Sequence, residues 1–348
     1  MKIAFIGFGG VGQALVKLIR DRRQQLLKDF GMDSTVVAVS DVMKGSVYDP
    51  NGLNEDLLLE TLATHNNLDY YPDTATTVKG MDSIRTIKET NADMIVEVTF
   101  TDVKTGQPAI DHCKAAFESH KSVVTTNKGP VAIAYQELAG LAKKQDVFWG
   151  FEGTVMSGTP ALRLPFTTLA GNEISEISGI LNGTTNFMLT EMEKGLSYQE
   201  ALSLAQSKGY AEADPTSDVE GYDARYKAVI LANVVLGTAL QAADVTCEGI
   251  TQLTGEHLQE AISNGQRWRL VARLTKEGDS VKASVKPELL AKDDPLANVS
   301  GALNAIIYTC DLAGPIMLTG AGAGLMETGY SLLIDLIHYQ KQKVLIKR

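Results

Sequence analysis

The N-terminal region alternates between short apolar runs and segments in which apolar residues recur at helical spacing. A run at residues 3–6 leads through glycines into such a segment, whose apolar face carries Val11, Leu15, Leu18 and Ile19. Three further runs of strand length, separated by helix-compatible sequence, lie at residues 36–39, 94–98 and 122–125. This alternation predicts an α/β fold with a doubly wound parallel sheet of Rossmann type.

Two later regions depart from this pattern. Residues 42–77 have weaker periodicity and one helical segment near 56–62, so we interpret them as an insertion. From about residue 149 glycine and threonine become dense, and alternating segments at 268–274 and 281–285 predict a second sheet.

The rest of the chain contains a strand-like segment at 174–180 and helical segments at 197–208, 224–237 and 327–337. We expect the last of these to return to the first domain. The predicted divisions are a nucleotide-binding Rossmann-type domain over residues 1–148, a second, α+β domain over residues 149–314 and a returning C-terminal segment over residues 315–348.

Composition narrows the class of protein. A chain of 348 residues with 44% hydrophobic residues can bury two cores, and its net charge of −10, without a basic stretch, disfavours nucleic-acid binding. No apolar run reaches membrane-spanning length and no signal peptide is visible, so we expect a cytoplasmic protein without membrane partners. Three scattered cysteines fit neither a disulfide framework nor a thiolate metal site.

Gly7, Gly9 and Gly12 form the pattern G-x-G-x-x-G between the first predicted strand and the first helix. In this context the glycines permit a tight turn, close approach of a pyrophosphate and close packing of the helix on the sheet. A glycine turn without a ligand is the alternative. The predicted nucleotide contacts are Gly7, Phe8, Gly9, Gly10, Val11 and Gly12.

Ser40 and Asp41 end the second predicted strand, where a carboxylate can accept hydrogen bonds from the adenosine ribose. An acidic side chain there disfavours the 2′-phosphate of NADP, although Lys44 could neutralise it, so NAD is only slightly preferred over NADP. The alternative is a solvated turn aspartate.

Thr99 and Lys128 follow two later strands, at the ends where open α/β sheets bind their ligands. In such a cleft a lysine can face a substrate carboxylate or the nicotinamide carboxamide. On an ordinary loop it would only be solvated.

The densest group of charged residues lies between residues 209 and 227. Asp223 and Lys227 are four residues apart at the start of an apolar helix, and hence on one face. A lysine at the mouth of a buried helix, beside carboxylates, has the features of a general acid/base. A simple helix ion pair preceded by an exposed acidic loop is the alternative.

Six motifs, including those described above, resemble homoserine dehydrogenase, and the resemblance covers nearly the whole chain. The motifs are Gly7-x-Gly9-x-x-Gly12, Thr125-Thr126-Asn127-Lys128, Glu152-Gly153-Thr154-Val155 running to Pro160, Ile180 to Asn186, the acidic cluster ending in Lys227, and Gly320 to Gly324. The resemblance implies an NAD- or NADP-dependent oxidoreductase that interconverts L-homoserine and L-aspartate-4-semialdehyde, on the route to threonine and methionine.

The resemblance also implies roles for individual residues. Lys227 is similar to the catalytic lysine of the family, with Asp223 and Lys128 beside it, and would protonate the substrate oxygen during reduction. The implied substrate-binding residues are Glu212, Asp218, Asn182, Gly183 and Thr184. The implied cofactor contacts are Ser40, Asp41, Thr99, Lys128, Gly183 and Gly322, in addition to the glycine turn.

A structural monovalent cation such as sodium is implied as well, held by Glu152 and the carbonyl groups of Val155, Ser157 and Thr159. The second domain would bind substrate and form a homodimer. The segment 174–180, which would need a partner to cover an edge or an apolar face, favours this too. The chain resembles the monofunctional short form, without a C-terminal ACT domain or an N-terminal aspartate kinase. A related dehydrogenase for another small amino acid or aldehyde, and a catalytically silent NAD(P)-sensing regulator, are the competing interpretations.

Overall fold

The computed structural model describes residues 1–346, with side chains through residue 342, and the chain divides into two compact units. Unit 1 comprises Met1–Thr154 and the segment from Gly324 onward, and unit 2 comprises Val155–Ala323. The last two residues of the predicted segment 315–348 lie outside the described residues. Among those that are described, no helix combines the length and apolarity needed to cross a membrane.

Unit 1 is built on a seven-stranded sheet in the order β4-β3-β2-β1-β5-β6-β7, with β1, β2, β5, β6 and β7 parallel. The strands are β1 (Lys2–Ile6), β2 (Thr35–Asp41), β3 (Gly45–Tyr48), β4 (Val78–Lys79), β5 (Met94–Glu97), β6 (Ser122–Thr125) and β7 (Trp149–Gly150). The helices are α1 (Gly10–Phe30), α2 (Glu55–His65), α3 (Ser83–Glu89), α4 (Ala109–Glu118), α5 (Lys128–Ile133), α6 (Tyr135–Lys144) and α13 (Leu325–Ile346). Short 3₁₀ turns lie at Leu68–Tyr70 and Glu152–Thr154.

The predicted parallel sheet carries two antiparallel strands at one edge. The insertion after Asp41 turns back at once, so β3 pairs antiparallel with β2, and β4 pairs antiparallel with β3. The helix predicted near residues 56–62 is α2. The insertion therefore extends the sheet by two strands beyond the one that carries Asp41.

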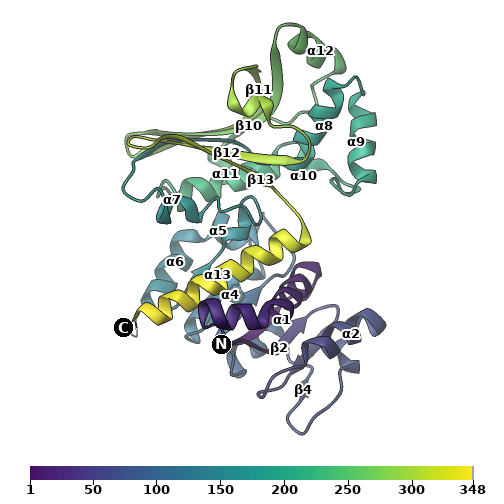
Figure 1. Ribbon diagram of the computed structural model, residues 1–348, viewed down its shortest axis with the longest axis vertical. Helices are drawn as coiled ribbons and strands as arrows, with labels where there is room; N and C mark the ends of the chain where they lie inside the picture. Colours follow the sequence, from purple (N-terminus) through teal and green to yellow (C-terminus); the bar gives the residue numbers. More distant parts are fainter. Residues whose placement is uncertain (347–348) are drawn as a thin grey trace. The chain divides into compact units, whose positions relative to one another are not determined.

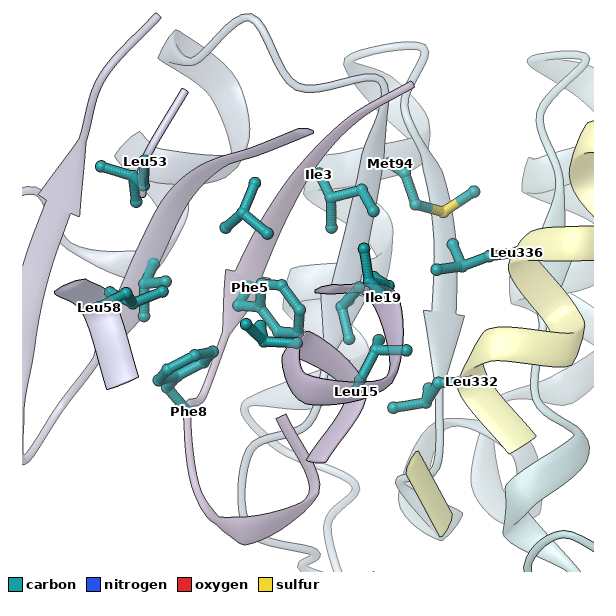
Figure 2. Close-up of a cluster of buried hydrophobic side chains, with 14 of the residues drawn as sticks. Ile3, Phe5, Phe8, Leu15, Ile19, Leu53, Leu58, Met94, Leu332 and Leu336 are labelled. Atoms are coloured by element: carbon teal, nitrogen blue, oxygen red, sulfur yellow. The ribbon is translucent and has the colours of Figure 1, made fainter. Parts of the chain in front are cut away.

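The core of unit 1 explains why the chain returns to it. Figure 2 shows Leu15 and Ile19 of α1 packed with Leu332 and Leu336 of α13 and with Phe5 of β1. These side chains are almost completely buried, and α13 lies along α1 (Figure 1). Helix α13 is thus a structural part of the nucleotide-binding unit, and its apolar spacing reflects this packing.

Unit 2 has a six-stranded sheet in the order β13-β12-β8-β10-β11-β9, antiparallel except where β9 joins β11. Its strands are β8 (Ile174–Ile180), β9 (Thr246–Cys247), β10 (Gln266–Glu277), β11 (Ser280–Ala291), β12 (Leu303–Cys310) and β13 (Gly314–Ala321). Its helices are α7 (Arg163–Thr167), α8 (Gly183–Glu193), α9 (Tyr198–Ser207), α10 (Thr216–Val219), α11 (Tyr222–Val234) and α12 (Gly255–Ser263). Short 3₁₀ turns lie at Ala242–Asp244 and Pro295–Asn298. The α/β class with a second α+β unit is confirmed.

Two details differ from the sequence-based expectation. Segment 174–180 is strand β8, but it lies between β10 and β12, so its edges are already paired. The unit boundaries lie at 154/155 and 323/324 because β7 completes the first sheet and β13 completes the second.

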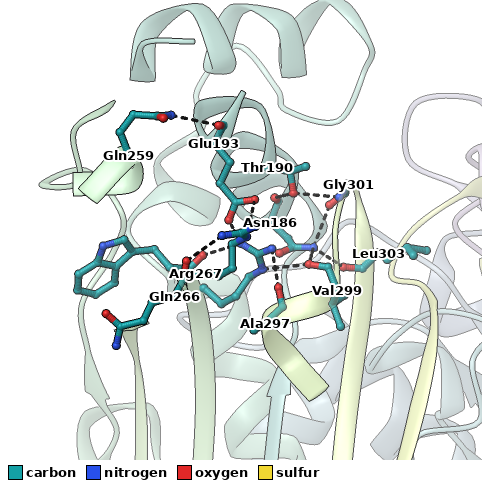
Figure 3. Close-up of polar contacts among 12 residues, drawn as sticks. Asn186, Thr190, Glu193, Gln259, Gln266, Arg267, Ala297, Val299, Gly301 and Leu303 are labelled. Atoms are coloured by element: carbon teal, nitrogen blue, oxygen red, sulfur yellow. Dashed lines mark hydrogen bonds and ion pairs between the residues drawn. The ribbon is translucent and has the colours of Figure 1, made fainter. Parts of the chain in front are cut away.

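Helix α8 is anchored by polar contacts that cross unit 2. The Asn186 side-chain N–H groups donate to the carbonyl oxygens of Val299, Gly301 and Leu303 at 3.0–3.3 Å, and Figure 3 shows these contacts as dashed lines. The fully buried Arg269 donates to Glu193, at the other end of the helix. The start of α8 is therefore held at a defined place beside β12.

Candidate active site

The glycine turn of unit 1 has the geometry of a nucleotide-binding turn. Gly7 has φ +82°, its N–H donates to the Ser40 carbonyl at 2.8 Å, and a Cβ there would lie 2.6 Å from the Val98 carbonyl oxygen. A Cβ on Gly9 would meet nothing within 4 Å. Gly9 precedes α1, which has no side-chain cap. Open space before an uncapped helix N-terminus fits a pyrophosphate.

Asp41 is tied to this turn. Its Oδ2 accepts from the Phe8 N–H at 2.7 Å, its Oδ1 accepts from Met43 and Lys44, and the Lys44 ammonium lies 3.6 Å away. Burial raises the pKa of Asp41, but these hydrogen bonds and the lysine outweigh it and leave the pKa below its ordinary value. The end of β2 thus presents an ionised carboxylate beside the glycine turn, which fits a dinucleotide with unmodified ribose hydroxyls.

Thr99 and Lys128 lie at the carboxyl ends of neighbouring strands, after β5 and β6 respectively. The backbone and hydroxyl of Thr99 donate to the buried Glu97 carboxylate. Lys128 is half-buried and begins α5, which Asn127 caps. The structure therefore brings both residues to the edge that carries the glycine turn.

In unit 2 the predicted acid/base cluster comes together around Lys227. The Lys227 ammonium, 7% exposed, donates to Asp223 Oδ2 and to the Leu181 carbonyl, each at 2.7 Å. Asn182 Nδ2 donates to Asp218 Oδ1 at 2.7 Å and to Asp223 Oδ2 at 3.0 Å. One buried ammonium thus shares a hydrogen-bond network with two carboxylates, which is more than a surface ion pair between neighbouring helical turns.

Asp218 is the perturbed acid of this network. Burial raises its pKa above the ordinary value, and the neighbouring Asp223 charge adds to the rise. The hydrogen bond from Asn182 and the charge of Lys227 act in the opposite direction without cancelling it. An ionised Asp218 is therefore strained electrostatically and would gain from a cationic ligand.

The other predicted substrate residues differ in their surroundings. Gly183 begins α8 directly after its cap, Asn182, and the Thr184 hydroxyl donates to the Tyr210 carbonyl. Glu212 is exposed, and among the described residues its carboxylate makes none of the hydrogen bonds of the Lys227 network. Glu212 thus lies on the loop before α10 rather than inside the cluster.

Sequence reasoning missed Asn304. A Cβ on Gly322 would lie 2.3 Å from its amide carbon, and a Cβ on Gly183 would lie 3.3 Å from its Oδ1. Asn304 is fully buried, and neither atom of its amide has a hydrogen-bond partner within the part of the chain that the structure describes. Gly322 therefore leaves room for this side chain, whereas a Cβ on Gly183 would first meet the Ala302 carbonyl oxygen at 2.7 Å. No local pattern in the sequence reveals these contacts.

The predicted cation-binding residues fall on both sides of the unit boundary. In unit 1 the Glu152 N–H donates to Asp335 Oδ2 at 3.0 Å, and Glu152 is buried. In unit 2 Met156 and Ser157 both have positive φ, 58° and 52°. Two successive non-glycine residues in this conformation are unusual and turn backbone carbonyl groups away from their regular directions.

A sequence profile of the homoserine dehydrogenase family matches residues 160–337. The NAD(+)-dependent homoserine dehydrogenase of Pseudomonas canavaninivorans is 46% identical over 97% of this chain and 95% of its own length. The chain belongs to the homoserine dehydrogenase family.

Two solved homoserine dehydrogenases share the fold over 98% of their own length. A putative homoserine dehydrogenase from Archaeoglobus fulgidus is 34% identical, with a TM-score of 0.87 over 97% of this chain and 98% of that one. A hyperthermophilic archaeal homoserine dehydrogenase in complex with NADPH is 29% identical, with a TM-score of 0.83 over 98% of both. The chain therefore matches these homoserine dehydrogenases along nearly their whole length and is an NAD(P)-dependent oxidoreductase of that activity.

Proposed function

We propose that this homoserine dehydrogenase uses Lys227 as its general acid/base, on the route to threonine and methionine. The observation that carries the proposal is the buried Lys227 ammonium, held 2.7 Å from Asp223 Oδ2 and from the Leu181 carbonyl. Oxidation of L-homoserine with NAD or NADP is the assay, and an inactive protein that still binds cofactor would favour a regulator. Turnover of another amino alcohol in place of homoserine would favour the related-dehydrogenase alternative.

Each residue of the proposed site has a separate role in the hydride and proton transfers. The bound nicotinamide supplies or accepts the hydride. As negative charge develops on the aldehyde oxygen, Lys227 donates a proton to it, and in the reverse direction takes the proton from the homoserine hydroxyl. Asp223 and the Leu181 carbonyl hold the ammonium in place, and Lys128 is proposed as a second catalytic lysine that also contacts the cofactor.

Asp218 and Glu212 are proposed to bind the α-ammonium group of the substrate, with Asn182, Gly183 and Thr184 shaping the site. The support is electrostatic, because a half-buried Asp218 with a raised pKa gains from a cation that takes part of its charge. Glu212 lies on the adjoining exposed loop, so its contribution is expected to be smaller.

Replacing Glu212 by Gln should raise the KM for homoserine by about tenfold, because one charge-assisted hydrogen bond is lost at an exposed position. The KM for a deaminated analogue, which has no ammonium group, and the dissociation constant for NADH should hardly move. Steady-state kinetics with both compounds measures the difference. Equal losses for the two compounds would show that Glu212 shapes the loop and does not bind the ammonium group.

We propose that the enzyme uses NAD at least as well as NADP. The proposed cofactor contacts are Gly7 to Gly12, Ser40, Asp41, Thr99 and Gly322. One relative is named NAD(+)-dependent, whereas the archaeal structure contains NADPH, so the choice rests on the chain's own residues. The ionised Asp41, fixed by the Phe8 N–H, repels a 2′-phosphate.

We therefore expect kcat/KM for NAD to equal or exceed that for NADP. An Asp41→Asn variant keeps an acceptor for the Phe8 N–H but loses the charge, and should shift the ratio toward NADP. Initial rates with both cofactors at fixed homoserine measure this. A wild-type preference of about a hundredfold for NADP, equivalent to about 2.7 kcal/mol, would mean that Lys44 controls the site instead.

A structural monovalent cation is proposed at Glu152 and the carbonyl groups of Val155, Ser157 and Thr159. The successive positive φ values of Met156 and Ser157 support it, because they turn carbonyl groups away from their regular directions, and carbonyl oxygens are ligands that hard cations prefer. Such an ion would stiffen the segment that joins the two sheets in sequence.

A homodimer through unit 2 is proposed, but on a different strand from the one first expected. Strand β13 lies at the edge of its sheet, paired with β12 alone, and carries the partly buried apolar residues Ile316, Met317 and Leu318. An eight-residue edge strand of this kind is typically covered. Light scattering should give twice the chain mass of 37.5 kDa, and a species of the single mass would contradict the proposal.

A further inference from the structure

Glu97 is a fully buried carboxylate at the end of β5, beneath the edge that carries Thr99 and Lys128. Its Oε1 accepts from the backbone N–H and the hydroxyl of Thr99, and lies 3.3 Å from His112 Nδ1 on α4. Its Oε2 accepts from the Thr125 hydroxyl at 3.2 Å. One carboxylate thus joins the ends of two strands and a helix.

The contacts of Thr125 continue toward Lys128. The Thr125 hydroxyl donates to the Glu97 carbonyl at 2.7 Å and accepts from the Asn127 N–H at 3.0 Å. The Asn127 amide then donates to the Phe100 carbonyl at 3.1 Å and accepts from the Gly129 N–H at 3.1 Å. A continuous series of hydrogen bonds therefore links Glu97 to the loop after β5, which carries Thr99, and to the loop after β6, which leads to Lys128.

Burying such a carboxylate is costly, and the fold does not require it. Isolated carboxylates in an apolar interior are strongly disfavoured, and replacing buried ionic groups by apolar ones of similar volume often leaves stability unchanged or improves it. The nearby strand interiors are filled by apolar residues such as Ile95 and Val124. A polar group at this position is therefore better explained by what it orients than by stability.

We propose that Glu97, supported by His112, is a positioning residue that sets the conformation of the Thr99 loop and of the Thr125–Lys128 loop for cofactor binding. The proposal rests on the proposed function in one respect, namely that these loops face the cofactor. It does not depend on the role of Lys227. His112, only 5% exposed, supplies the Nδ1 contact that keeps Glu97 oriented between the loops.

The test is equilibrium binding of NADH, followed by its fluorescence, alongside thermal melting. Glu97→Leu removes both carboxylate oxygens, and with them the contacts to Thr99 and His112, although the Glu97 carbonyl that accepts from Thr125 remains. It should weaken NADH binding by about 10- to 100-fold, because small displacements of positioning groups have effects of this size. Glu97→Gln keeps one oxygen for Thr99 and should recover most of the affinity. His112→Phe should act in the same direction as Glu97→Leu, and the double variant should be no worse than the more impaired single one.

Lys121→Met is the matched control. Lys121 is also buried, and its ammonium donates to the Thr90 carbonyl at 2.6 Å, but at the opposite ends of the same two strands. This variant should lower the melting temperature and leave NADH affinity within about threefold of the parent. The comparison separates a loss of stability from a loss of loop positioning.

Thr125→Val provides a second route if Glu97→Leu does not fold. It removes only the hydroxyl between Glu97 and Asn127, and should also weaken NADH binding. NADH affinities of folded Glu97→Leu, or failing that of Thr125→Val, within about threefold of the parent would overturn the proposal. Because the readout is binding, an error in the Lys227 mechanism would not produce that result.

Discussion

Replacing Lys227 by Ala should lower kcat for homoserine oxidation by about 10²–10⁴-fold, the usual contribution of a general acid/base. NADH binding should persist, because the glycine turn and Asp41 that are proposed to hold the cofactor belong to unit 1. Steady-state kinetics and NADH fluorescence together measure the two effects. A kcat within about threefold of the parent would remove Lys227 from the mechanism.

The stability of the variant must be controlled, because Lys227 balances a buried charge. Its removal leaves Asp223 without the partner at 2.7 Å, and breaking a buried ion pair costs about 3–5 kcal/mol. Lys227→Arg retains a positive charge but cannot exchange its proton near neutral pH, so it should be comparably inactive while losing less stability. Lys194→Ala, which removes an exposed lysine bound to Glu191 at 2.7 Å, should leave kcat unchanged.

The parts of the site that sequence reasoning predicted are those defined by short spacing. The glycine turn lies between a strand and a helix within ten residues, and Asp223 and Lys227 are one helical turn apart, so local geometry alone brings their atoms together. The returning helix α13 was predicted for a similar reason, since its apolar spacing required a surface to pack on.

The parts that were missed depend on contacts between distant residues. The Leu181 carbonyl that holds Lys227 is 46 residues away from it, and Glu97 meets Thr125 across 28 residues. Asn304 comes between Gly183 and Gly322 only because β12 and β13 pair beside the start of α8. Likewise, the periodicity of segment 174–180 identified a strand but carried no information about its neighbours in the sheet.

The surroundings of Asp218 lead to a prediction in which stability and activity change in opposite directions. Its folded-state pKa is raised mainly by burial, so the ionised form costs folding free energy at neutral pH. Stability is therefore highest below the ordinary pKa and falls as the pH rises through the higher folded-state pKa. Asp218→Asn keeps an acceptor for Asn182 and removes the charge, so at neutral pH it should melt at the same or a higher temperature.

The same substitution should lower kcat/KM for homoserine by about 10- to 150-fold, the equivalent of one charge-assisted hydrogen bond of about 1.5–3 kcal/mol. Asp214→Asn is the matched control on the same loop. The Thr216 hydroxyl and N–H hold the pKa of the exposed Asp214 below its ordinary value, so this variant should be slightly less stable and fully active.

Thermal melting across pH distinguishes the two carboxylates. The advantage of Asp218→Asn over the parent should shrink as the pH falls through the folded-state pKa of Asp218 and vanish below the ordinary pKa, where the parent carboxyl is neutral in both the folded and the unfolded state. Asp214→Asn should instead melt below the parent at neutral pH, and this difference in melting temperature should also shrink at low pH. If Asp218→Asn melts below the parent at neutral pH while homoserine kinetics are unchanged, Asp218 is a structural partner of Asn182, and the substrate ammonium must be bound elsewhere in the Lys227 cluster.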